Sequence, residues 1–364
     1  MSTFFFTGFP GFIARELVKE IVQEIQNITS MYFLVLEPQL QTARLEVEKL
    51  EIKFPEQKGR FHLIVGDITK PSLGLQDEKL KQLTTEVNYV YHLAALYDLA
   101  VDRTAAETVN VKGTKHVSRW TATLPHLERY VYFSTAYVSG KREGRIYEKE
   151  LDKGQSFKNH YEETKFIAEK VVSSYTSQIP TTIIRPGIVR GHSATGETIK
   201  FDGPYFMLNF FDRLGFLPVI PYLGAGNVDG NFVPVDYVIK ATTYLSHISA
   251  SIGKTYHLTD PSPLRMKEVY RLLMEEYLGK QPIGTVPLQS ATYFLRYKKM
   301  RQWLGVEKES LAYFTYNAIY DTSQAEKDLE PTGIHVPSFK ETLPSMVSYF
   351  KQFKADPQKK VKIN

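Results

Sequence analysis

The stretch TGFPGFIA at residues 7–14 follows an apolar run at residues 3–6 and precedes apolar side chains that recur near helical spacing. This order predicts a buried strand, a glycine turn and a helix. Gly8 would let the turn close, Gly11 would let the backbone approach a bound group, and the helix N-terminus would attract a pyrophosphate. Because such a turn often has no ligand, nucleotide binding needs support from the rest of the chain.

The 364-residue chain has an ordinary globular composition, with 43% apolar residues and no cysteine. It is long enough for one large or two unequal domains. The lack of cysteine excludes disulfides, thiolate metal sites and a cysteine-bound acyl intermediate, and no other metal-ligand spacing appears. No apolar run approaches a membrane span, and the N-terminus lacks the features of a secretion signal. We therefore expect a cytoplasmic protein with no integral membrane segment and no metal.

The net charge of +5 is concentrated in a basic tail at residues 351–364, which carries five lysines against one aspartate. The rest of the chain is nearly neutral and lacks the basic face with interleaved aromatic residues that nucleic-acid binding needs. We therefore expect no nucleic-acid partner and a solvated tail. Attraction of the tail to an acidic carrier protein or an anionic membrane surface remains an alternative.

Apolar runs alternate with helical segments through the first half of the chain. This alternation implies right-handed crossovers, a parallel sheet and ligand binding at the carboxyl ends of the strands. The later predicted strands span residues 31–36, 61–65, 87–93 and 130–134, and the predicted helices include residues 77–85, 104–120 and a segment from residue 160 to about 177.

Residues at three predicted strand ends suit a dinucleotide. Glu37 follows the second strand, where its carboxylate would accept hydrogen bonds from an adenosine ribose and repel a 2′-phosphate, which favours NAD over NADP. Arg44 in the following helix would still reach such a phosphate. Asp67, after the third strand, would accept from the adenine amino group, and Ala94 and Ala95 would leave room for the ligand. Taken singly, Asp67 and the two alanines suit an ordinary turn or packing role better.

Tyr161 and Lys165 are four residues apart and so share one face of the helix that follows the fifth strand. A phenol has a pKa of about 10, and an adjacent ammonium group would favour the phenolate and lower that pKa. A hydroxyl of Thr135 or Ser134, at the end of the fifth strand, would hold a substrate carbonyl in line. A tyrosine and a lysine four residues apart are common in helices. This pair becomes significant because it follows a fifth strand in a chain that begins with a glycine turn.

Seven motifs stand in one order along the chain, at residues 7–14, 66–67, 92–95, 110–114, 134–138, 161–165 and 185–189. Over about the first 260 residues this order resembles the extended short-chain dehydrogenase/reductase superfamily. Residues 66–68, 73–75, 134–138 and 202–205 resemble its thioester reductase branch, with a male-sterility type NAD-binding domain. That branch includes fatty acyl-CoA reductases and the reductase domains of carboxylic acid reductases.

The resemblance implies catalytic roles for Asn110, Thr135, Tyr161 and Lys165. Tyr161 would be the general acid, Thr135 rather than Ser134 would supply the catalytic hydroxyl, and Lys165 would bind the nicotinamide ribose and tune the tyrosine. The implied cofactor-binding residues are Gly8, Phe9, Pro10, Gly11, Phe12, Ile13, Glu37, Arg44, Asp67, Ile68, Ala94, Ala95, Tyr161, Lys165, Pro186 and Ile188.

Two residues depart from the family pattern. Ala14 replaces a more frequent glycine, which is a tolerable change, and Glu37 stands where the reductases usually carry an arginine for NADP. The expected cofactor is therefore NAD(P)H, with Glu37 favouring NAD and the family resemblance favouring NADP.

The expected fold is a Rossmann-type, doubly wound α/β sheet with a smaller, mainly helical C-terminal cap for the substrate. Its boundaries are predicted at residues 1–190 with 225–260 for the dinucleotide-binding domain, 191–224 with 261–350 for the cap, and 351–364 for the basic tail.

Residues 201–224 of the predicted cap are rich in aromatic and aliphatic side chains, which would line an acyl channel or only form the core of the cap. Amphipathic helices are expected at residues 265–278 and 290–303. The second carries a basic cluster that would meet the phosphates of coenzyme A or of a carrier's phosphopantetheine, or would be a solvated face. Its members are Arg296, Lys298, Lys299 and Arg301.

The sequence therefore predicts an NAD(P)H-dependent reductase that converts an acyl thioester, bound to coenzyme A or to an acyl carrier protein, into an aldehyde. One alternative is a nucleotide-sugar epimerase or dehydratase, or a hydroxysteroid or flavonol-type dehydrogenase. A second is a non-catalytic dinucleotide-binding redox sensor. A homodimer is expected by analogy with the superfamily.

Overall fold

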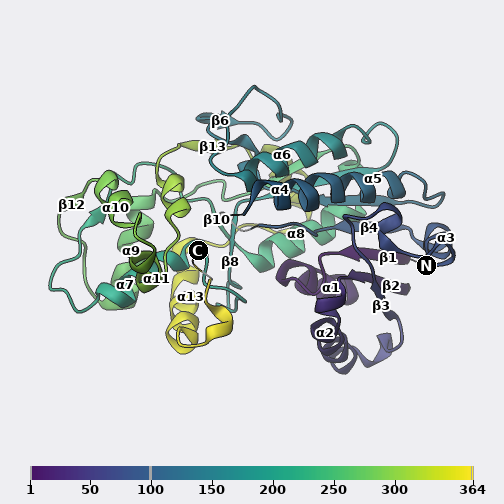
Figure 1. Cartoon of the computed structure of the whole chain (residues 1–364), viewed down its shortest axis with the longest axis horizontal. Helices are drawn as coiled ribbons and strands as arrows, with labels where there is room; N and C mark the ends of the chain where they lie inside the picture. Colours follow the sequence, from purple (N-terminus) through teal and green to yellow (C-terminus); the bar gives the residue numbers. More distant parts are fainter. Residues whose placement is uncertain (1, 98–100, 362, 364) are drawn as a thin grey trace.

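A seven-stranded parallel sheet organises the chain in the computed structural model, which describes residues 2–97, 101–361 and 363 (Figure 1). The strand order is β11-β7-β5-β4-β1-β2-β3, so the direction of winding reverses between β1 and β4, where doubly wound sheets bind their ligands. The strands are β1 (Ser2–Thr7), β2 (Ile28–Val35), β3 (Phe61–Val65), β4 (Tyr89–His92), β5 (Arg129–Phe133), β7 (Thr181–Pro186) and β11 (Thr255–Leu258).

Helices cover both faces of this sheet, which confirms the predicted doubly wound fold. One face is packed by α1, α2, α8 and α12, and the other by α3, α5 and α6. These helices are α1 (Phe12–Glu24), α2 (Leu40–Lys53), α3 (Asp77–Glu86), α5 (Thr114–Thr121), α6 (His160–Ser173), α8 (Val235–His247) and α12 (Ser323–Leu329).

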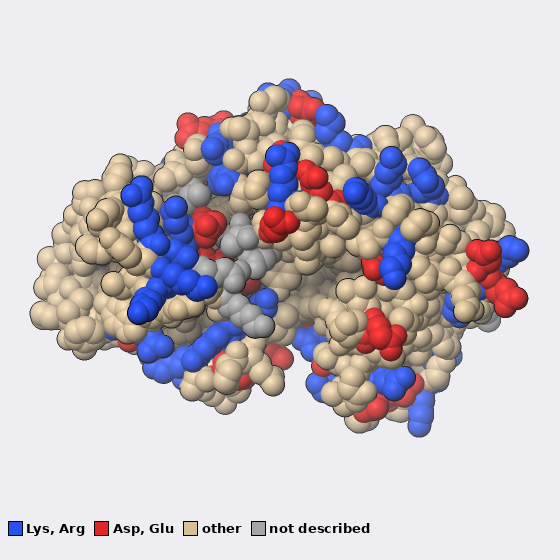
Figure 2. Space-filling model, in the orientation of Figure 1, with Lys and Arg blue, Asp and Glu red and all other residues tan. Residues whose placement is uncertain are grey.

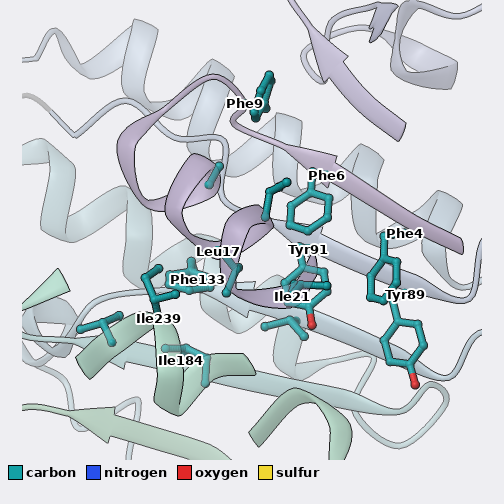
Figure 3. Packing of buried hydrophobic residues seen from close by; sticks show 14 of the residues in the cluster. Phe4, Phe6, Phe9, Leu17, Ile21, Tyr89, Tyr91, Phe133, Ile184 and Ile239 are labelled. Atoms are coloured by element: carbon teal, nitrogen blue, oxygen red, sulfur yellow. The ribbon is translucent and has the colours of Figure 1, made fainter. Parts of the chain in front are cut away.

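Apolar spacing in the first helix fixes how it packs. Leu17 and Ile21, one helical turn apart, are fully buried and point from α1 toward the rings of Phe6 and Tyr91 in the sheet (Figure 3). Those two rings stack with their centroids 4.8 Å apart. Strand and helix therefore leave the glycine turn in fixed directions.

The predicted element boundaries agree closely with the structure in this half of the chain. The third strand has the predicted ends, the second begins three residues earlier, and the helix from residue 160 ends at Ser173 instead of near residue 177. The predicted helix at 104–120 is interrupted, since a π-helical turn at Glu107–Gly113 separates α4 (Arg103–Ala106) from α5. Such turns occur often at functional sites, and Asn110 lies in this one.

The cap has its own apolar core, built mainly from α7 (Tyr205–Leu214), α9 (Met266–Leu278) and α13 (Phe339–Phe353). It lies on the side of the molecule away from β2 and β3 (Figure 1). Short strand pairs complete the structure: β8 (Ile188–Arg190) with β10 (Phe232–Pro234), β9 (Tyr222–Leu223) with β12 (Thr285–Val286), and β6 (Gly144–Ile146) with β13 (Ala318–Tyr320).

One expectation for the C-terminal part was wrong. The helix predicted at 290–303 is two short helices, α10 (Leu288–Phe294) and α11 (Lys298–Leu304), because the backbone leaves helical geometry at Leu295 and is extended at Tyr297. No residue in the described part of the basic tail is buried, but two contacts hold it to the cap: Phe201 N donates to Lys359 O at 2.8 Å, and Lys354 Nζ lies 2.6 Å from Asp212 Oδ1. Within the described residues, no helix combines the length and the apolar character needed to cross a bilayer.

Candidate active site

The turn after β1 allows close approach to its backbone. Gly8 has a φ of +88°, and a Cβ there would lie 2.8 Å from Ala94 N. Gly11 N donates to Gly8 O at 2.8 Å, and a Cβ on Gly11 would lie 2.6 Å from that oxygen. Since glycine precedes α1, no N-cap side chain occupies its first N–H groups, which remain for a pyrophosphate. This cradle fits the phosphates of a dinucleotide.

The other residues of the turn support it from the core. Phe9 is 1% exposed and stacks on Phe33 with the ring centroids 4.3 Å apart, so only its backbone remains for a ligand. Pro10 is half-buried, and Phe12 and Ile13 are half-buried against the core beneath the first face of the sheet.

The residues predicted to meet the adenosine lie beyond the carboxyl ends of β2 and β3. Glu37 is exposed two residues after β2, and Arg44 is exposed on α2. Asp67 Oδ1 accepts hydrogen bonds from Thr69 N at 2.8 Å and Thr69 Oγ1 at 2.7 Å, which fixes the carboxylate in its loop. Ile68, by contrast, is buried in the apolar core on the face of the sheet that α3, α5 and α6 cover.

A buried hydrogen-bond network joins the glycine turn to β4. Thr7 Oγ1 accepts from Ala94 N at 3.1 Å and lies 2.7 Å from His92 Nδ1, and His92 Nε2 lies 2.9 Å from Thr114 Oγ1. Burial, with a smaller contribution from the charge of Lys165, lowers the pKa of His92 to about 3, so the ring is neutral. The half-buried Ala94 and Ala95 are thus held beside Gly8.

The hydroxyl groups of Thr135 and Tyr161 meet where β5 ends. Thr135 follows that strand, is 5% exposed and has its hydroxyl group near the phenol of Tyr161, which lies in the first turn of α6. Burial raises the pKa of Tyr161 to about 12, and the nearby Thr135 hydroxyl opposes this rise. The expected lowering of this pKa by Lys165 was wrong for this structure, and the phenol stays protonated at neutral pH.

The reason is the position of the Lys165 ammonium group. Lys165 Nζ donates to Phe133 O at 2.6 Å and to Tyr132 Oη at 2.9 Å, both on β5. Desolvation lowers the pKa of Lys165 to about 7, although the carboxylate of Glu169 opposes this. The ammonium group of Lys165 therefore lies at the end of β5, hydrogen-bonded to residues of that strand and not to the phenol of Tyr161.

Asn110 is 1% exposed and connects three parts of the site. Its Oδ1 accepts from Leu96 N at 2.8 Å, and its Nδ2 donates to Leu96 O at 3.0 Å and to Thr164 Oγ1 at 3.0 Å. The side chain thereby fixes the loop after β4 against α6, close to Tyr161 in sequence. The π-helical turn that carries Asn110 sets the position of this side chain.

Sequence reasoning missed a buried ion pair beneath these residues. Glu169 accepts from Arg185 Nε at 3.0 and 3.1 Å, and the Ser134 hydroxyl also donates to Glu169. Ser134 is thus occupied, whereas Thr135 contacts Tyr161. A signal was present, because Glu169 lies one helical turn beyond Lys165 on the same face of α6.

A second missed feature lies at the start of α6. Lys158 Nζ donates to Gly140 O at 2.6 Å and lies 3.4 Å from Glu162 Oε1, with both side chains almost fully buried. Its ammonium group is also 5.4–5.5 Å from the ring centroids of Tyr137, Tyr313 and Tyr316. The cluster joins the segment after Thr135, the start of the Tyr161 helix and part of the cap. Lys158 and Glu162 are four residues apart, but the tyrosines of the cluster are too distant in sequence for a local pattern to reveal them.

The loop predicted beside the carboxamide connects the sheet to the cap. Pro186 is buried as the last residue of β7, and Ile188 is half-buried as the first residue of β8. Ile188 packs against the apolar core of the cap, and its Cγ2 lies 2.7 Å from the position that a Cβ of Gly203 would take. This loop therefore spans from the strand ends of the sheet to the start of the cap.

Comparison with known proteins gives the family. Residues 6–242, which are more than half of the chain, match the NAD-binding family that is described as male sterility protein. The chain belongs to this male sterility protein family. The match contains the glycine turn, Asn110, Thr135, Tyr161 and Lys165. It confirms the predicted resemblance to the thioester reductase branch of the extended short-chain dehydrogenase/reductases.

The chain is also similar to individual proteins of known type. A non-canonical nonribosomal peptide synthetase, cpsA of Aspergillus campestris, is 26% identical over 78% of the chain, and a putative fatty acyl-CoA reductase of Drosophila melanogaster, CG8306, is 24% identical over 77%. The chain covers 28% and 63% of these two proteins.

A solved structure also resembles the chain over nearly its whole length. It is the terminal R domain from the myxalamid PKS-NRPS biosynthetic pathway, with a TM-score of 0.83 and 27% identity, covering 97% of this chain and 91% of that one. The similarity includes the cap as well as the sheet, so the two-part architecture is shared.

Proposed function

We propose that the chain is an NAD(P)H-dependent reductase that converts an acyl thioester into an aldehyde. The observation that carries this proposal is the proximity of the Thr135 and Tyr161 hydroxyl groups at the end of β5, beyond the glycine turn and strand ends that suit a dinucleotide. Two hydroxyl donors at one point suit a carbonyl oxygen that becomes an oxyanion. The glycine turn, Pro186 and Ile188 would hold the dinucleotide beside them, with Lys165 at its nicotinamide ribose.

When held by the glycine turn and the strand ends, NAD(P)H would supply a hydride to the acyl carbon. As that C–H bond forms, the carbonyl π electrons move to oxygen, where Thr135 and Tyr161 stabilise the negative charge and Tyr161 donates its proton. The resulting hemithioacetal loses its C–S bond: the electron pair leaves with sulfur, the hydroxyl proton passes to the thiolate, and aldehyde and thiol remain. With its pKa raised to about 12, the Tyr161 phenol is fully protonated before the reaction, and it would release that proton only as negative charge develops on the acyl oxygen.

A substrate panel tests this reaction against the alternatives. Oxidation of NADH and of NADPH would be followed by absorbance with an acyl-CoA, an aldehyde and a ketosteroid, and conversion of a UDP-sugar would be followed by analysis of its products. We expect consumption with the acyl-CoA and the appearance of free thiol in equal amount. Turnover of the UDP-sugar or the steroid alone would favour those dehydrogenases, and cofactor binding without turnover of any substrate would favour a redox sensor.

Glu37 provides a test of cofactor choice. Its carboxylate is exposed beyond β2, where it would repel a 2′-phosphate, so we propose a preference for NADH. Glu37→Arg is expected to shift the ratio of kcat/KM toward NADPH by about tenfold or more, equivalent to about 1.4 kcal/mol. The matched control is Glu56→Arg, the same charge change at an exposed site beyond the helix that carries Arg44. An unchanged ratio in Glu37→Arg would show that this side chain does not meet the ribose.

The basic cluster on the cap suggests how the coenzyme A or phosphopantetheine part of the thioester is held. Arg296, Lys298 and Lys299 are exposed, and Figure 2 shows lysine and arginine side chains gathered on the lobe that holds α10 and α11. We propose that this surface attracts the phosphates of coenzyme A or phosphopantetheine. Lys298→Glu with Lys299→Glu is expected to raise KM for acyl-CoA at low salt and to leave KM for the phosphate-free acyl-pantetheine unchanged. An equal change for both substrates would rule out a phosphate contact.

A further inference from the structure

The cap contains an apolar cavity of about 350 Å³ between α7, α10, α11 and the segment Lys308–Phe314. Phe206 and Phe210 contribute from α7, Ala291 from α10, and Met300 and Leu304 from α11. Among the described residues that line it, Ser310 carries the one hydroxyl group that is not a phenol, and no charged side chain takes part. The volume falls in the range of ligand pockets, about 300–1,000 Å³.

This lining discriminates between classes of acyl group. Every peptide unit carries a donor and an acceptor that must be paired when buried, and the cavity offers almost no partners for them. A cationic or hydroxylated group would be left unsatisfied in the same way. An alkyl chain loses no hydrogen bonds on entry, and its affinity grows with each methylene group removed from water.

One segment that lines the cavity also packs against the start of the helix that carries Tyr161. Leu311 lines the cavity, and two residues later Tyr313 packs edge-on against Tyr137, with ring centroids 4.9 Å apart. Asn159 Nδ2, at the N-cap of the helix that carries Tyr161, lies 3.4 Å from Tyr313 Oη. One short segment therefore forms both a wall of the cavity and a contact with the start of α6.

The opposite wall makes a similar connection. Helix α7, which lines the cavity with Phe206 and Phe210, begins two residues after Gly203, and Gly203 contacts Ile188 of the predicted carboxamide loop. The segment with Leu311 and Tyr313 and the segment from Gly203 to α7 would therefore both lead from a carbonyl held at Tyr161 toward the cavity. Helix α11 separates this cavity from the basic surface, with Met300 and Leu304 on the inner side and the exposed Lys298 and Lys299 on the outer side.

We propose that this cavity holds the aliphatic tail of the acyl substrate and makes the chain selective for unsubstituted alkyl thioesters over peptidyl or other polar thioesters. The proposal rests on the thioester reductase function above and names its substrate class. On this basis kcat/KM rises by roughly threefold for each methylene group until the cavity is filled.

Ala291→Phe tests the cavity by filling it from a small half-buried residue. With acyl-CoA substrates from butyryl to hexadecanoyl, this variant is expected to lower kcat/KM for the longer chains by about tenfold or more, and by much less for butyryl-CoA. Gln289→Phe is the matched control, since it adds the same side chain at an exposed position of the same helix. Phe210→Ala enlarges the cavity and is expected to move the optimum to longer chains, which keeps the test independent of the folding of Ala291→Phe.

Direct binding separates this proposal from the proposed reaction. A fluorescent fatty acid is expected to bind the wild type and Tyr161→Phe equally and to bind Ala291→Phe at least tenfold more weakly. If no thioester turns over but this binding pattern is found, the cavity proposal stands and the reductase function fails. If thioesters turn over but neither cavity variant alters the dependence on chain length, or if peptidyl thioesters react as well as dodecanoyl-CoA, the cavity proposal is overturned.

Discussion

Tyr161→Phe is expected to lower kcat for thioester reduction by about 10³-fold, within the range of about 10²–10⁴ for loss of a general acid. The variant removes the proton donor and one of the two hydroxyl groups at the end of β5, and it leaves the ring in place. Affinity for NAD(P)H should be nearly unchanged, because the glycine turn and the strand ends that would hold the dinucleotide are untouched. Stopped-flow single turnovers and a fluorescence titration with NADH measure the two effects separately.

Tyr147→Phe is the matched control, since this phenol is 44% exposed and lies outside the proposed site. It should retain full activity. Equal losses of turnover and cofactor affinity in Tyr161→Phe would assign this tyrosine to binding and would contradict its role as the acid.

Lys165→Met is expected to reduce kcat/KM by about 10²-fold or more, as for loss of a charged group that orients a reactant. The ammonium group bound to Phe133 O and Tyr132 Oη is placed at the strand end where the nicotinamide ribose would lie. The loss should appear mainly as a raised Kd for the dinucleotide. An unchanged Kd with a lowered kcat would mean that Lys165 acts on Tyr161 alone.

The same variant is expected to be more stable than the wild type at low pH. The pKa of Lys165 is about 7 in the folded chain and 10.5 when unperturbed, so between these values the unfolded chain binds more protons and stability rises with pH. The cost of burying this amine is therefore fully present below pH 7 and disappears as pH approaches 10.5. We expect Lys165→Met to raise the free energy of unfolding by about 2 kcal/mol at pH 6, after allowance for two lost hydrogen bonds.

Denaturant titrations at pH 6 and pH 9 measure this difference, which should shrink at the higher pH. Lys170→Met is the control on the same helix, because its ammonium group is half exposed beside Asp152. It should change stability little at either pH. A wild type that is more stable than Lys165→Met at pH 6 would show that the hydrogen bonds to β5 outweigh the cost of burial.

Most of the sheet could be predicted from the sequence because its signals are local. The apolar run before Gly8, the helical spacing after it and the repetition of this unit fix the strands and the crossovers. Predictions weakened in the cap, where residues 290–303 have a continuous helical pattern and the backbone nevertheless leaves helical geometry at Leu295 and becomes extended at Tyr297. Helical spacing of apolar residues does not show where one helix ends and the next begins, and tertiary packing can override local preference.

The candidate residues were predicted as a set, but their partners were not. Tyr161 and Lys165 share a helix face as their spacing requires, yet Lys165 binds the backbone of β5, and the pKa of Tyr161 is raised instead of lowered. Which group an ammonium ion meets depends on the position of a strand more than thirty residues away in the chain.

The sequence by itself determined the glycine turn, the order of strands and helices, and the residues carried at the strand ends, because each depends on neighbours within one turn or one strand. Only the tertiary structure decided that Thr135 lies near Tyr161, that Lys158 lies among three tyrosines from two parts of the chain, and that the cap forms an open apolar cavity. Those features arise where segments far apart in sequence pack together, and the free energy of that packing belongs to no single segment.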